Sequence, residues 1–75
     1  MTTKDPALLT LCEDYLTIQS PYNARFVADL KEEVPPEERM WDPDQKVWEV
    51  SADLYDTAME VASRYYNVKV EICNG

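Results

Sequence analysis

The fold of this chain is set largely by residues 20–50, SPYNARFVADLKEEVPPEERMWDPDQKVWEV, where a helix pattern, two prolines and a tryptophan-flanked turn follow one another. Asn23 comes shortly after Pro21 and is a natural helix N-cap. The residues after it separate into an apolar helix face and a charged one: Phe26, Val27, Leu30 and Val34 against Arg25, Asp29, Glu32 and Glu33. Pro35 and Pro36 should end this helix, because the residue before a proline leaves the α conformation and proline has no N–H to donate.

A β-hairpin is predicted directly after the two prolines. Its arms are residues 39–41 and 46–50, and its turn is formed by Asp42, Pro43, Asp44 and Gln45. Alternation along the second arm places Trp48 and Val50 on one face, and Val47 and Glu49 on the other. We therefore expect Trp48 to join the core and Trp41 to pack across from it.

The N-terminal part is compatible with two structures. Residues 8–12 and 15–19 read as two short strands joined at Glu13 and Asp14. Alternatively, Asp5 and Pro6 cap a helical turn that runs through Leu11, because proline fits the first position of a helix. The sequence alone leaves the first strand open.

A second helix and a last strand complete the pattern. Ser51 is the expected N-cap, and one helix face carries Leu54, Ala58, Val61, Ala62 and Tyr65. Asn67 is expected to end the helix in a left-handed conformation. Val68, Val70 and Ile72 then alternate as a strand.

Together these elements predict an α+β fold in the order β-β-α-β-β-α-β, a small, mostly antiparallel sheet with two helices on one face. With 75 residues the chain suffices for a single domain, residues 1–75, with one small core. Residues 1–7 and 74–75 are expected to be loose ends.

Composition narrows the classes of function. The net charge of −8, from 15 acidic and 7 basic residues, disfavours nucleic acid and favours a basic protein partner. With no histidine and no close-spaced cysteine pair, we expect no metal site and no cofactor. The sequence shows no leader and no membrane-spanning run, so we expect a cytoplasmic protein without membrane contact in which Cys12 and Cys73 are free thiols.

The central region resembles the HARP domain, the HepA-related-protein module that accompanies annealing helicases. The resemblance lies in Pro21, Tyr22 and Asn23, in a helix with Phe26 and residues 30–31, and in the hairpin residues Arg39, Trp41, Asp42, Lys46 and Trp48. It implies a role around forked or single-stranded DNA. This chain departs from the family by the acidic PPEE segment and by its strongly acidic charge, and the 75 residues themselves contain no helicase motor.

Three functions follow as hypotheses, and none is catalytic, because the turn carboxylates are open to water and no histidine is present to activate a nucleophile. The first is protein binding by an acidic surface of Glu37, Glu38, Asp42 and Asp44, with Tyr22, Trp41, Tyr55 or Tyr66 as an exposed aromatic anchor. The second is direct binding of single-stranded or forked DNA by Arg39, Trp41, Lys46 and Trp48. The third is an inhibitor of the kind that phages encode, whose acidic face imitates nucleic acid. The sequence predicts no oligomeric state.

Overall fold

The structure, a computed structural model, describes residues 4–73 and confirms the α+β class and the predicted order of elements. The elements are β1 (Asp5–Leu11), β2 (Tyr15–Gln19), α1 (Ala24–Glu33), β3 (Arg39–Asp42), β4 (Val47–Ser51), α2 (Tyr55–Tyr65) and β5 (Tyr66–Ile72). Two short 3-10 turns, η1 (Pro36–Glu38) and η2 (Ala52–Leu54), precede β3 and α2.

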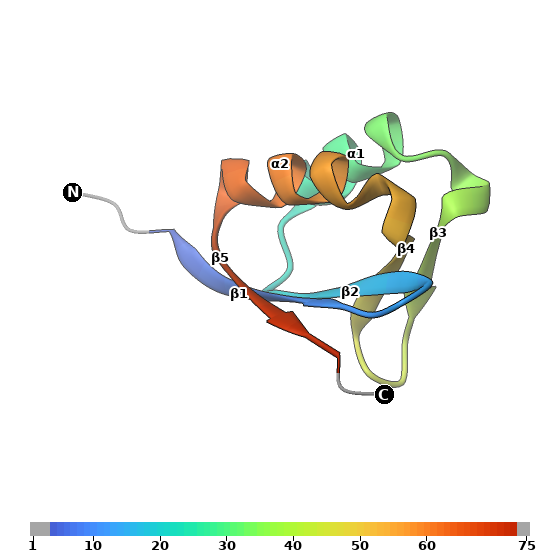
Figure 1. Ribbon diagram of the computed structural model, residues 1–75. Helices are drawn as coiled ribbons and strands as arrows, with labels where there is room; N and C mark the ends of the chain where they lie inside the picture. Colours follow the sequence, from blue (N-terminus) through green and yellow to red (C-terminus); the bar gives the residue numbers. More distant parts are fainter. Residues whose placement is uncertain (1–3, 74–75) are drawn as a thin grey trace.

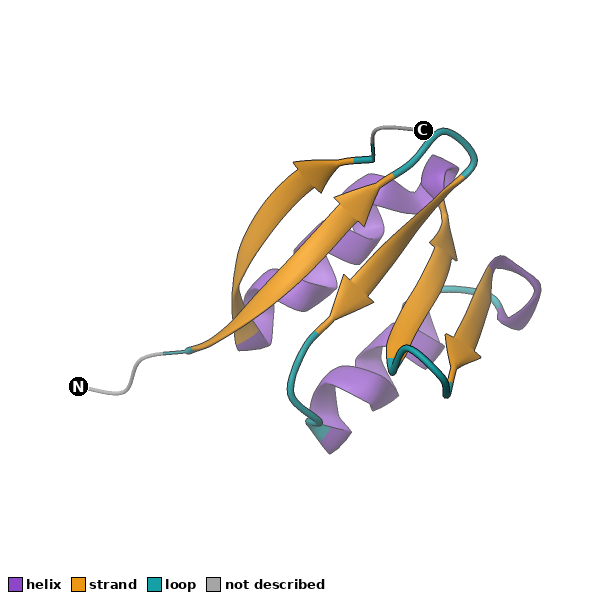
Figure 2. Cartoon of the chain, turned by 90° about the horizontal axis from the view of Figure 1, so that it is seen from below, coloured by secondary structure: helices purple, strands orange, loops and turns teal. Residues whose placement is uncertain are grey.

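The five strands form one sheet in the order β3-β4-β2-β1-β5. All neighbouring strands are antiparallel except β1 and β5, which are parallel. Both helices cover the same face of the sheet (Figure 1). Seen from the other side, the strands lie in front of the helices and their face is open (Figure 2).

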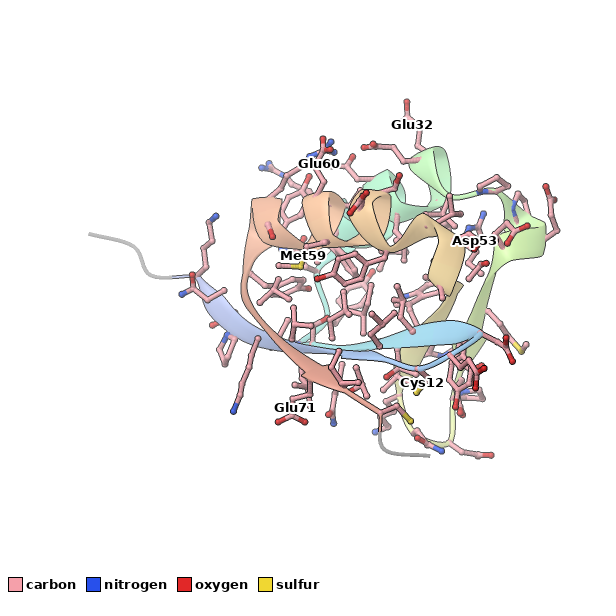
Figure 3. The ribbon with its side chains drawn as sticks, viewed as in Figure 1. Cys12, Glu32, Asp53, Met59, Glu60 and Glu71 are labelled. Carbon is pink, nitrogen blue, oxygen red and sulfur yellow. The ribbon has the colours of Figure 1, made fainter. Side chains whose placement is uncertain are left out.

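The core lies between the helices and the covered face of the sheet. Alternate strand residues point into it, and the helices close it with one face each: Ala7, Leu9, Leu16, Ile18 and Val50 from the sheet, and Phe26, Leu30, Ala58, Val61 and Ala62 from the helices. Met59 lies between α2 and the sheet, whereas Glu71 points away on the open face (Figure 3). Trp48 packs against this core, as the alternation predicted.

Helix α1 begins and ends where the sequence predicts. The Asn23 side-chain oxygen accepts hydrogen bonds from the backbone N–H groups of Arg25 (2.9 Å) and Phe26 (3.3 Å), which is the geometry of an N-cap. Val34, immediately before the prolines, already has extended backbone. Its carbonyl oxygen accepts a hydrogen bond from Arg39 Nε at 3.0 Å, which joins the end of α1 to β3.

Strand β1 corrects two expectations. It begins at Asp5, so the alternative of a helical turn through Leu11 is wrong, and Asp5 to Ala7 are not a loose end. Pro6 is tolerated because β2 pairs only with residues 8–11, so the side on which Pro6 lacks an N–H meets no neighbouring strand. Residues 1–3 and 74–75 lie outside the described part of the chain.

The ends of α2 also differ from the prediction. Ser51 closes β4 and makes no side-chain cap, because a 3-10 turn intervenes before the helix. Asn67 is already extended within β5, since the chain passes straight from α2 into that strand at Tyr66. Tyr66 is buried and packs edge-to-face against Phe26, with their ring centroids 5.2 Å apart. Its hydroxyl donates a hydrogen bond to the Pro21 carbonyl oxygen at 2.6 Å. This buried tyrosine ties the start of β5 to the start of α1.

Arg64 links the two helices on their outer side. Its guanidinium donates to Glu33 at 2.6 Å on α1 and to Glu60 at 3.0 Å on α2. These carboxylates raise the pKa of Arg64. Asp29 accepts a hydrogen bond from Tyr65, which raises the pKa of that phenol. No helix in residues 4–73 combines the length and the apolar character needed to cross a bilayer.

Candidate binding surfaces on the β3–β4 hairpin

The turn between β3 and β4 is built by its own polar groups. Asp42 Oδ1 accepts the backbone N–H groups of Asp44 (2.9 Å) and Gln45 (3.2 Å), and the Asp42 carbonyl accepts that of Lys46 at 2.7 Å. Lys46 has φ of 58°, the only positive φ of a non-glycine residue among residues 4–73. The predicted hairpin is therefore confirmed, but β3 continues through Asp42 and Lys46 belongs to the turn.

An aromatic groove lies on the helix-covered side of this hairpin. Trp41 and Trp48 are cross-strand partners whose ring centroids are 5.3 Å apart. Trp48 is half-buried, whereas Trp41 is 45% exposed, and the exposed side chain of Tyr22 also lines the groove. The groove has a volume of about 230 Å³ and is lined by Ile18, Ser20, Pro21, Tyr22, Asn23, Phe26, Val27, Trp41, Lys46 and Trp48.

The aromatic groove is continuous with a wider hollow near the ends of β1 and β2. The hollow, of about 610 Å³, shares Ser20, Pro21 and Lys46 with the groove and adds Lys69 and Glu71 from β5. Among residues 4–73, Lys46 is the only charged residue that lines the aromatic groove. Exposed aromatic rings therefore continue into a surface that carries two lysines and one glutamate.

An acidic pocket lies beside the open face of the sheet, on the other side of the same hairpin. Met40 and Glu49 are cross-strand partners, one position along from the tryptophan pair, and so point away from the helices. Met40 is 62% exposed, and Tyr15 on β2 is 43% exposed. The pocket has a volume of about 190 Å³ and is lined by Tyr15, Glu37, Glu38, Arg39, Met40, Glu49, Val50 and Ser51.

The hairpin separates the two predicted residue sets. Trp41, Lys46 and Trp48 come together in the aromatic groove, but Arg39 does not join them, because it lines the acidic pocket and its Nε is bound to the Val34 carbonyl. Glu37 and Glu38 lie at the acidic pocket. Asp42 holds the turn with its side chain, and Asp44 is exposed on that turn.

The predicted aromatic anchors are reduced to two. Tyr66 is 2% exposed, so the expectation that it could serve as an exposed anchor is wrong. Tyr55 is partly buried against the core. Tyr22 and Trp41 are exposed. From the sequence alone, no binding role is assigned to three residues of the acidic pocket, Tyr15, Met40 and Glu49. Strand alternation predicts the face of each residue, but only the pairing of β2 with β4 brings Tyr15 to Glu49 and Met40.

Comparisons with protein-family models, with curated proteins and with solved structures give no match for this chain. The resemblance to the HARP domain therefore stays a prediction, as do the roles it implies.

Proposed function

We propose that this chain is a non-catalytic protein-binding module whose acidic pocket takes a basic segment of a partner protein. The supporting observation is that the exposed side chains of Met40 and Tyr15 line this pocket together with three carboxylates, those of Glu37, Glu38 and Glu49. A lysine or arginine can lay its aliphatic stem on apolar side chains and direct its charge to carboxylates. The resemblance to the HARP domain suggests DNA-processing machinery as the source of such a partner.

Charge and apolar contact are expected to affect different steps of binding. A net charge of −8 draws a basic partner toward the module and speeds encounter, with an effect that weakens as salt rises. Rim charges contribute modestly once the complex has formed, whereas a desolvated apolar anchor contributes to affinity. Met40 is therefore expected to affect the dissociation rate, and Glu37 and Glu38 the association rate.

The first test is a titration of a labelled oligo-arginine peptide, followed by fluorescence anisotropy at low and physiological salt. The variant Glu37→Lys with Glu38→Lys should weaken binding by at least about tenfold at low salt, because two attractive charges become repulsive. Asp42 is left intact, since its side chain holds the turn.

A matched control removes the effect of overall charge. Glu32→Lys with Asp5→Lys changes two exposed acids outside the pocket and alters the net charge by the same amount. If both double variants weaken binding equally, the peptide responds to net charge alone and the proposed site is wrong. Met40→Gln should weaken binding without changing its salt dependence.

Single-stranded or forked DNA is the second candidate, and the aromatic groove supports it. Trp41 and Tyr22 are exposed for stacking, Lys46 lies beside them, and none of the acids lines the groove. The net charge opposes this function at long range. The phage-type inhibitor remains a hypothesis, and it shares the requirement for a basic partner surface.

Anisotropy of labelled single-stranded and forked DNA separates the two candidates. Trp41→Ala should abolish binding in the groove, whereas Tyr15→Ala should not, although the two side chains are 45% and 43% exposed. Loss in both variants, or in neither, would count against the groove. Absence of binding at low salt, where phosphate contacts are strongest, would exclude direct DNA recognition.

A further inference from the structure

Strand β5 forms an open edge of the sheet. It is seven residues long, pairs with β1 on one side and has no described element on its other side within residues 4–73. An unpaired edge strand presents backbone N–H and C=O groups that can pair with another strand. The seven residues contain no proline, glycine or bulge that would block such pairing.

The hydrogen-bonding side of each β5 residue follows from one contact. The N–H of Cys73 donates to the Leu11 carbonyl at 2.8 Å and so points toward β1. Backbone groups of successive strand residues point to opposite sides, so Lys69 and Glu71 also turn toward β1. The N–H and C=O groups of Val68, Val70 and Ile72 therefore face the open edge.

We propose that β5 pairs antiparallel with β5 of a second copy of this chain, in a two-fold register centred on Val70. In this register Val70 lies opposite its own copy and Val68 opposite Ile72 of the other copy. All three edge-facing residues then meet edge-facing residues, which yields about six backbone hydrogen bonds across the interface. The two sheets become one continuous sheet, and this inference does not depend on the proposed function of the hairpin.

The charges of β5 select this register. Glu71 points to the open face of the sheet (Figure 3), and Lys69, two residues before it in β5, lies on the same face. In this register each copy's Lys69 therefore lies directly opposite the other copy's Glu71. These positions form the non-hydrogen-bonded pairs, in which Cα atoms approach to about 4.5 Å and side chains are closest. A register centred on Lys69 or Glu71 instead places that residue opposite its own copy, where like charges repel. Only the Val70 register pairs opposite charges on both sides.

Apolar side chains on the helix side support the same pairing. Val70 is 37% exposed and Ile72 is 65% exposed in the single chain. In the proposed dimer Val70 contacts Val70 and Ile72 contacts Val68 of the other copy. Cross-strand contacts of this kind stabilise sheets. The Lys69–Glu71 pair of the single chain is loose, at 3.8 Å with both side chains exposed, so it can exchange for the contact between copies.

The first test removes one edge-facing N–H. Sedimentation velocity of the full chain, from micromolar to millimolar concentration at physiological salt, should show a monomer–dimer equilibrium. Val70→Pro should abolish the dimer while circular dichroism stays unchanged, because that N–H makes no bond within the chain and proline is tolerated on edge strands. Val70→Ala is the control, since it keeps the N–H and should still dimerise.

The second test exchanges the charges. Lys69→Glu and Glu71→Lys, each alone, should raise the dissociation constant by about tenfold, because each places like charges opposite one another twice. The combined variant Lys69→Glu with Glu71→Lys restores opposite charges and should dimerise within about twofold of the original chain. A monomer at every concentration, a dimer that survives Val70→Pro, or a combined variant that stays dissociated would each overturn the proposal.

Discussion

The two edge strands of the sheet, β3 and β5, differ in what they offer to a partner. In β3, the Asp42 carbonyl accepts the Lys46 N–H and so points away from the open edge. Because the backbone groups of successive strand residues point to opposite sides, those of Arg39 and Trp41 face the edge. The Arg39 N–H is already bound to the Pro36 carbonyl. The strand is four residues long and lies between two proline-containing turns. In β5, by contrast, three successive edge-facing residues keep their backbone groups free in the described structure. The two proposals therefore assign recognition through side chains to β3 and recognition through the main chain to β5.

The two edges also differ in how they are held. The β3–β4 hairpin is tied to the core by Trp48 and Val50, which contact the helices and the neighbouring strand. Strand β5 is held along its whole length by pairing with β1 and by the buried Tyr66 at its start. The far end of β5 nevertheless contributes little apolar burial to the fold, because Val70 is 37% exposed and Ile72 is 65% exposed.

The largest expected effect tests this contrast in stability. Trp48→Ala should lower the free energy of unfolding by about 2–4 kcal/mol, because a large aromatic side chain leaves the core. Ile72→Ala should change it by less than about 0.5 kcal/mol, since that side chain is 65% exposed. Urea denaturation followed by circular dichroism, at low concentration where the proposed dimer dissociates, measures both. Equal losses would show that the end of β5 is part of the core.

The next effect concerns the backbone of β5. In dilute solution the amides of Val68, Val70 and Ile72 should exchange with solvent at least about tenfold faster than those of Lys69 and Glu71, which face β1. Hydrogen exchange measured by NMR should show this alternation. Raising the concentration should slow only the edge-facing amides, and the same experiment on Val70→Pro provides the control. Uniform protection along β5 would contradict the assigned directions.

A smaller effect is expected at the turn that borders β3. Lys46 has φ of 58°, a left-handed conformation that costs a residue with a Cβ about 1–2 kcal/mol. Glycine adopts this conformation without that cost, but it loses more backbone entropy on folding, so only part of the cost is recovered. Lys46→Gly should therefore raise the free energy of unfolding by about 0.5–1 kcal/mol, measured by urea denaturation. Lys46→Ala removes the charge but keeps the Cβ, so its stability should stay unchanged. A gain in both variants would assign the effect to charge.

The sequence predicts the local structure of this chain well because its signals are local. Asn23 and the two prolines define α1 by cap geometry and by the missing N–H, without any tertiary contact. Strand alternation likewise predicts that Trp48 faces the core. At the ends of α2 the same local signals mislead: Ser51 and Asn67 have the residue types of caps, but strand pairing overrides those preferences.

The sequence predicts the binding surfaces less completely, because they depend on strand order. No local sequence pattern predicts that β5 lies beside β1 at an edge of the sheet. Neither the unpaired backbone groups of β5 nor the burial of Tyr66 can therefore be derived from the residue types alone. The sequence likewise groups Arg39 with Trp41, although the Arg39 guanidinium reaches back to Val34 at the end of α1. Residue types predict what each side chain can do, and topology decides which of them meet.

The smallest expected effect lies at the end of β5, where Cys73 approaches Cys12. Both are free thiols; a hydrogen bond with Cys12, and then burial, raises the pKa of Cys73. A raised pKa lowers the thiolate fraction at a given pH, and alkylation requires the thiolate. Cys12→Ala should therefore shift the pH dependence of Cys73 alkylation by iodoacetamide to lower pH, measured by mass spectrometry.

Tyr15→Phe is the control, because it removes a phenol whose own pKa Cys12 raises but keeps the contact between the two thiols. An unchanged profile in Cys12→Ala would contradict the contact between the two thiols from which this shift is expected.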